Sequence, residues 1–282
     1  SKLDTTSNHA KARATRRMLE NFHGAPNAEA VAKAWPYLGS DDYHLRYAAR
    51  IAVEWQEPKS WAQKAYDEKD DLAAIHALLG LARSDLEGSL KPSINRLLRV
   101  DFDKLDKTGK LALLRTYAVI MSRGGKPEAE QINAVGAQLD AYYPAKDDNL
   151  NEELCRVLCY LEHPSVVSKT IALMKTTKAK IPDYDVEVMK RHAGYGGKIL
   201  GTMKQDVTPN VLNIHFLFCL KDVQKGWTMK DRKAYLGELQ NLMSKKGGNM
   251  FTGYIQKIRE SAIASVPEKD RVALQYLMGT VK

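Results

Sequence analysis

Two side chains with metal-binding chemistry lie four residues apart near the end of the chain, His215 and Cys219. On a helix this spacing places both on one face, and imidazole with thiolate is a ligand pair that zinc and copper accept. His192 could supply a third ligand. The pair also lies in the strongly apolar segment 209–223, where a histidine and a cysteine are ordinary core residues. The core interpretation is favoured, and no metal site is predicted.

Paired carboxylates occur at four places, as general acid–base chemistry would require. Adjacent residues point in different directions on a helix, and three of the pairs lie where helices are expected to begin, so we predict that they cap free amide groups. The pairs are Asp41/Asp42, Asp70/Asp71, Asp147/Asp148 and Glu152/Glu153. No serine-hydrolase, zinc-protease, phosphate-loop or dinucleotide-binding motif appears. The sequence predicts no catalytic residue, and a non-enzymatic role is preferred.

The three cysteines are too few for a disulfide framework in a chain of 282 residues. Cys155 and Cys159 are four apart, which puts them on one helix face in poor geometry for bridging each other. We expect them, with Cys219, to be buried free thiols.

The net charge of +9 comes from 43 Lys and Arg against 34 Asp and Glu, and its distribution is uneven. Residues 1–26 carry 5 basic and 2 acidic side chains, a net of +3; residues 27–168 carry 18 and 22, a net of −4; residues 169–282 carry 20 and 10, a net of +10. The basic ends indicate an anionic partner or solvated helix faces. A candidate basic patch near the start comprises Lys11, Arg13, Arg16 and Arg17.

Two glycine-containing breaks in the last third hold the other candidate binding residues. A glycine is expected where a helix bends or ends, and nearby aromatic and charged side chains are then available to a ligand. The candidates are His192, Tyr195, Gly196, Gly197 and Lys198 at the first break, and Trp227, Arg232 and Lys233 after the second. Trp35, Trp61 and Trp227 are candidate partner contacts or staples between helices.

The composition predicts an all-α protein. Ala and Leu total 62 against 28 for Val and Ile, and 18 Gly with 10 Pro supply too little strand and turn material for a β architecture. No apolar stretch reaches the roughly 20 residues that a membrane span needs. The start, at Ser1, is expected to belong to a mature protein or to a piece of a longer one.

Helical pairs recur along the chain. The first helix of each pair is expected near residues 28, 58, 91, 126 and 163, in steps of 30, 33, 35 and 37 residues. A pair of this length cannot bury its apolar face alone, so stacking into an α-solenoid is the expected solution. We predict HEAT-like helical pairs over 1–180 and irregular helical repeats that continue the solenoid over 181–282.

Several segments in order resemble the HEAT-repeat region of large secreted bacterial haem-binding proteins. They are Arg13–Glu20, Ala34–Asp42, Leu154–Met174, Tyr195–Gly197 and Gly226–Tyr235. In that family a sugar-dehydrogenase-like β-propeller precedes the helical region and a c-type cytochrome domain follows it. The resemblance implies an exported, periplasmic or extracellular, and redox-associated multidomain setting.

The chain departs from the family's cytochrome part. Covalent haem attachment needs Cys-x-x-Cys-His, whereas Cys155 and Cys159 have three residues between them and Tyr160 follows. No cofactor is therefore predicted in this chain, and haem would belong to an absent neighbouring domain. The expected function is a non-catalytic scaffold that docks proteins or neighbouring domains. The alternative is a nucleic-acid-binding HEAT-like protein, similar to DNA glycosylases of that fold, which would use the basic ends.

Overall fold

The computed structural model describes residues 8–84, 87–178, 191, 194, 209–245 and 250–278. Across these ranges the chain is helical and contains no strand, which confirms the all-α prediction. The chain divides into two compact units, 1–138 and 139–282. The expected change of repeat type between 180 and 181 lies outside the described residues. No helix in the described ranges is long and apolar enough to cross a membrane.

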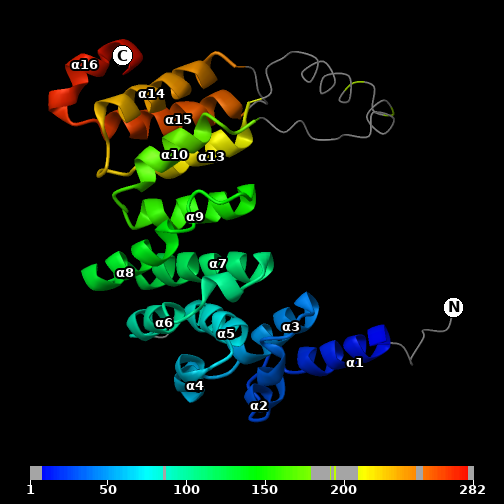
Figure 1. The fold of residues 1–282 in the computed structure, drawn as a ribbon. Helices are drawn as coiled ribbons and strands as arrows, with labels where there is room; N and C mark the ends of the chain where they lie inside the picture. The colour runs from blue at the N-terminus through cyan, green and yellow to red at the C-terminus, as the bar shows by residue number, and fades with distance from the viewer. Residues whose placement is uncertain are drawn as a thin grey trace. The chain divides into compact units, whose positions relative to one another are not determined.

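The first unit is built from short helices that pack in sequence order (Figure 1). Helix α3 packs against α1, α2 and α5, while α7 packs against α5 and α6, and α4 against α5 and α6. The helices are α1 (Asn8–Glu20), α2 (Ala30–Ala34), α3 (Tyr43–Glu54), α4 (Ala62–Asp67), α5 (Asp71–Arg83), α6 (Leu90–Leu97) and α7 (Lys107–Gly124), with 3₁₀ turns η1 (Trp35–Tyr37), η2 (Pro58–Ser60) and η3 (Phe102–Lys104). Helix α8 (Ala129–Asp140) contains the boundary between the units.

Prolines account for two departures from the expected helix bounds. The sequence predicts one helix over 28–38, but Pro36 has no N–H to continue the α pattern, and the segment ends in the 3₁₀ turn η1. Pro58 opens the turn η2 rather than a helix, and α4 begins only at Ala62.

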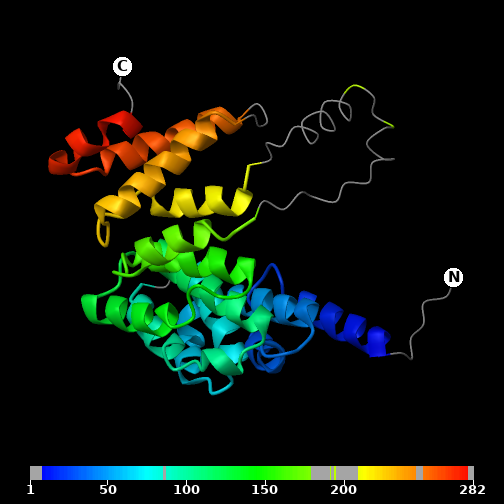
Figure 2. The same cartoon turned by 45° about the horizontal axis from the view of Figure 1, so that its top comes forward.

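The second unit packs around α13. Helix α9 contacts α10 and α13, α14 contacts α10, α15 and α16, and α13 also contacts α10 and α15. The helices are α9 (Asp148–Tyr160), α10 (Val166–Met174), α13 (Val211–Leu220), α14 (Met229–Met243), α15 (Phe251–Ala264) and α16 (Glu268–Met278). The long helices α14 and α15 lie side by side in both views (Figure 1 and Figure 2).

Side-chain caps start the helices where the carboxylate pairs predicted them. Asp42 accepts hydrogen bonds from the His44 and Leu45 amides at the start of α3. Asp70 and Asp147 do the same for α5 and α9, and Thr228 forms a capping box with Asp231 at the start of α14. The capping role is confirmed for the three pairs at helix starts, through Asp42, Asp70 and Asp147, whereas Glu152 and Glu153 lie inside α9.

Candidate docking surface

An exposed aromatic pair lies on helix α3 in the first unit. Tyr43 and Tyr47 are 61% and 49% exposed, and the four-residue spacing brings their rings together on one helix face. The rings are stacked, with centroids 6.3 Å apart and planes inclined at 27°. The Arg50 guanidinium lies 5.1 Å from the Tyr47 centroid, within cation–π range. We call Tyr43 and Tyr47 the tyrosine pair.

A row of charged side chains runs from the tyrosine pair on α3 to helix α5. Arg50 is buried and pairs with Glu54, whose other carboxylate oxygen accepts from Arg83 Nε on α5 at 3.1 Å. The Arg83 carbonyl in turn accepts from Arg123 Nη1 on α7 at 3.2 Å. Because the single Glu54 carboxylate pairs with two guanidinium groups, Arg50, Glu54 and Arg83 together keep a net positive charge.

The close approach of α3 and α5 depends on Gly80. A Cβ atom at this position would lie 3.2 Å from Glu54 Cγ and 3.6 Å from Arg50 Cγ, which is tighter than ordinary van der Waals contact for the first of these. The missing side chain on α5 therefore leaves room for the Arg50–Glu54 pair between the helices.

His76 of α5 lies beside the same arginines. Neither ring nitrogen has a hydrogen-bond partner, although both are covered from solvent. Burial, then the charges of Arg46 and Arg50, lower the pKa of His76 to about 4. His76 is therefore neutral at pH 7. We call Arg46, Arg50, Glu54, His76 and Arg83 the cationic seam.

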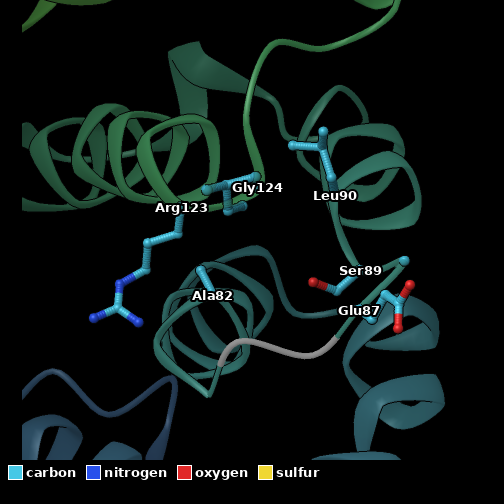
Figure 3. A pocket seen from close by; sticks show the side chains of 8 residues that line it. Ala82, Glu87, Ser89, Leu90, Arg123 and Gly124 are labelled. Atoms are coloured by element: carbon cyan, nitrogen blue, oxygen red, sulfur yellow. The ribbon is translucent and has the colours of Figure 1, made fainter.

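Two cavities adjoin this part of the first unit. One of about 690 Å³ includes Arg46 in its lining, with Asp41, Asp70, Asp71 and Asp106 among the other residues. The second, of about 340 Å³, lies where the ends of α5 and α7 meet the segment that leads into α6. Figure 3 shows Ala82, Leu90 and Gly124 around it, with the Arg123 guanidinium directed away from Glu87.

The predicted basic patch lies on α1, which packs against α3. Lys11, Arg13, Arg16 and Arg17 are all exposed. Arg16 forms an ion pair with Glu20 at 2.7 Å. At 100° per residue, Arg13, Arg16 and Arg17 lie on one side of helix α1, whereas Lys11 lies off that side. The four basic residues therefore do not form a single continuous face of α1.

Of the other candidate binding residues, the structure brings Trp227 and Arg232 together. The Arg232 guanidinium lies 5.0 Å from the Trp227 ring centroid, and its Nε is 3.8 Å from an Asp270 carboxylate oxygen. Arg232 is buried, and burial lowers the pKa of its guanidinium. Lys233 is exposed and is not part of this contact. His192, Tyr195, Gly196, Gly197 and Lys198 lie outside the described residues.

Trp35 and Trp61, each predicted to be either a partner contact or a staple between helices, act as staples in the structure. Trp35 and Trp61 are buried and meet edge to face, with ring centroids 6.4 Å apart. The Trp35 indole N–H donates to Glu68 at 2.6 Å, which satisfies its polar atom. Both side chains belong to the core of the first unit.

His215 and Cys219 are neighbours, but the histidine is engaged elsewhere. His215 Nε2 lies 3.3 Å from Cys219 Sγ and 3.0 Å from the Glu152 carbonyl oxygen. Because a carbonyl oxygen only accepts, Nε2 carries the proton and is neither a base for the thiol nor a metal ligand. In the part of the chain that the structure describes, no group of three or more His, Cys, Asp or Glu residues is arranged to hold a metal ion.

The cysteines are free, as predicted, and they form one cluster. Cys155 and Cys159 on α9 have sulfur atoms 3.7 Å apart. Hydrogen bonding to Cys155, together with burial, raises the pKa of both Cys159 and Cys219. Burial opposes ionisation of Cys155, but hydrogen bonds from Cys159 and Cys219 outweigh it and lower the pKa of the Cys155 thiol. Cys155 and Cys159 are buried, so no substrate reaches them and we interpret the cluster as a packing feature of the second unit.

The sequence reasoning missed the tyrosine pair, Arg50 and His76. A signal was present, because Tyr43 and Tyr47 follow the Asp42 cap with four-residue spacing and so must share a helix face. Whether that face is exposed depends on which helices pack around α3, which the spacing does not state. No family model, curated protein or solved structure matches this chain.

Proposed function

We propose that this chain is a HEAT-like α-solenoid that docks other protein domains, within or cut from an exported multidomain bacterial protein. Successive packing of α3, α5 and α7, with α4 against α6, supports repeating helical pairs in the first unit. The exported setting and the neighbours, a β-propeller and a c-type cytochrome domain, rest on the resemblance described above. Any dehydrogenase or electron-transfer activity would belong to those neighbours.

The observation that carries the docking function is the tyrosine pair. Tyrosine and arginine are enriched at protein interfaces because they bury much surface with few rotatable bonds and keep a polar tip. Stacking and the Arg50 contact hold the rings in place before any partner arrives. Less conformational entropy is then lost on binding.

Binding of the separately expressed neighbouring domains to this chain, measured by isothermal titration calorimetry, tests the proposal. Replacing both tyrosines (Y43A/Y47A) should weaken binding by about tenfold or more. Tyr276→Ala is the matched control, because Tyr276 is an exposed tyrosine on α16 and its loss should leave the affinity unchanged. Absence of binding to either neighbour, or binding that ignores the tyrosine pair, would contradict the proposal.

The alternative, nucleic-acid binding, is supported by one specific arrangement. Stacked aromatic rings beside arginines suit unpaired bases and phosphates, and α1 with its basic patch packs on the same helix α3. Fluorescence anisotropy with a labelled thymidine oligonucleotide separates the two functions. Tight, salt-sensitive binding that Y43A/Y47A abolishes would replace docking as the function, whereas absence of binding at low salt would eliminate the alternative.

A further inference from the structure

Helix α13 is almost entirely apolar, and yet one of its sides is exposed. Its ten residues include no charged side chain, and its two polar ones, Asn213 and His215, bond to carbonyl groups of α10 and α9. A helix that is apolar all round is normally buried in a core or lies in a membrane. Val211 and Phe218 are nevertheless 72% and 43% exposed. One side of α13 therefore presents apolar surface that no described residue covers.

The exposed side of α13 continues onto the neighbouring helix α15 (Figure 1). At 100° per residue, Val211, Ile214 and Phe218 lie on one side of α13. The Phe218 ring stacks on Tyr254 of α15, with centroids 6.1 Å apart and planes inclined at 21°. Met250, at the start of α15, is 84% exposed, and Tyr254, one turn further, is 45% exposed. We call Val211, Phe218, Met250 and Tyr254 the apolar patch.

Lysines border the apolar patch. Lys221 Nζ lies 5.1 Å from the Phe218 ring centroid and also forms an ion pair with its neighbour Asp222. Lys257 is exposed and follows Tyr254 by three residues, on the same side of α15. From the start of α13 to the end of α16 the sequence has 11 basic and 6 acidic side chains, a net of +5. The apolar patch therefore lies in a positively charged setting, which an anionic partner complements.

We infer that the apolar patch docks the second unit on the surface of an anionic lipid bilayer. Its side chains enter the boundary between headgroups and acyl chains, where aromatic rings are favoured, and Lys221 and Lys257 reach the phosphates. A protein partner needs polar groups to fix its orientation, whereas the exposed side of α13 offers no hydrogen-bonding group. A second copy would bring like charge against like charge. The inference is independent of the docking function, because the tyrosine pair belongs to the first unit.

Flotation of the full chain with two kinds of lipid vesicle tests the inference. One kind is pure phosphatidylcholine, and in the other a third of the lipid is phosphatidylglycerol. We expect the chain to float with the anionic vesicles, to bind the neutral ones about tenfold more weakly, and to be released as the salt concentration rises. No binding to the anionic vesicles, or equal binding to both kinds, would overturn the inference.

Two double variants separate insertion of the apolar patch from general charge attraction. F218S/Y254S removes both rings and keeps every charge, so the affinity for anionic vesicles should fall about tenfold. V272S/Y276S is the control, because Val272 and Tyr276 are exposed apolar residues of α16 in the same unit, and it should leave the affinity unchanged. No loss in the first variant, or equal losses in both, would contradict insertion at the patch.

A variant expected to bind more tightly keeps the test valid if F218S/Y254S unfolds. Val211→Trp adds an indole, which prefers the membrane interface, so the affinity for anionic vesicles should rise about threefold and the added emission should shift to the blue. Val272→Trp should do neither. The same response in both variants, or none in either, would reject the patch as the contact. Dimers in sedimentation equilibrium that F218S/Y254S abolishes, without vesicle binding, would assign the patch to a second copy instead.

Discussion

Trp55 and Trp61 are the same residue type six positions apart, yet the fold uses them in opposite ways. Trp61 is 1% exposed and packs against Trp35, whereas Trp55 ends α3 at 48% exposure. Trp61→Ala should lower the free energy of unfolding by about 3–5 kcal/mol, because it removes a large buried side chain and leaves a cavity. Trp55→Ala should stay within about 0.5 kcal/mol. Urea unfolding followed by far-UV circular dichroism measures both, and equal losses would contradict the assignment of Trp61 as a staple.

His76 makes the stability of the first unit depend on pH. Its pKa in the folded chain is about 4 against 6.5 in an unfolded one, so the unfolded chain binds an extra proton between these values. Stability should therefore fall as pH decreases from about 6.5 to about 4, by on the order of 3 kcal/mol from this residue. Urea unfolding followed by tryptophan fluorescence reports this unit, since three of the four tryptophans lie in it.

The control variant for the pH dependence of unfolding is His76→Leu, because leucine has no group that titrates. It should be more stable than the parent at pH 7, because two unpaired buried nitrogens are gone. Its stability should also change less between pH 6.5 and pH 4. A parent and variant with parallel pH profiles would show that other groups dominate and that His76 is not held neutral by the seam.

At the scale of elements, two glycines of the second unit have opposite roles. Gly226 has φ +78° before α14, and a Cβ there would lie 2.6 Å from the Pro164 carbonyl oxygen. Gly226→Ala should cost more than about 1 kcal/mol through strain and this clash. Gly237, inside α14, has open space around it, so Gly237→Ala should stabilise by up to about 1 kcal/mol. Thermal unfolding followed by circular dichroism tests the pair, and a shift of the same sign in both would refute the distinction.

Local sequence signals predict where helices begin far better than which faces meet. The cap at Asp42 and the capping box of Thr228 are local, because the side chain and the amides it accepts from are within three residues. The cationic seam is not local: Arg50 and His76 come together only once α5 packs beside α3. The thiol cluster likewise needs α13 to reach α9 across more than fifty residues. Long-range packing of this kind leaves no fixed spacing to recognise.

At the scale of the whole molecule, the charge distribution bears on whether a polyanion would be attracted by the total positive charge or by a few residues at one site. The net charge is −4 over 27–168 and +10 over 169–282, while the candidate basic patch lies before both. If docking is the function, the basic excess mainly keeps helix faces solvated, and binding to a polyanion should follow the number of charges rather than their place. If nucleic acid is the partner, a few arginines beside the tyrosine pair should dominate.

Two sets of four substitutions to Gln test this contrast. One neutralises the basic patch, and the other removes four exposed lysines of the second unit, Lys230, Lys233, Lys257 and Lys269. We expect both sets to lower the salt concentration of elution from a heparin column to a similar extent, since each removes four positive charges of solvated faces. A much larger effect from the basic patch would show that charge acts at one place, on α1, which packs against the helix that carries the tyrosine pair. That result would favour a nucleic-acid interface over protein docking.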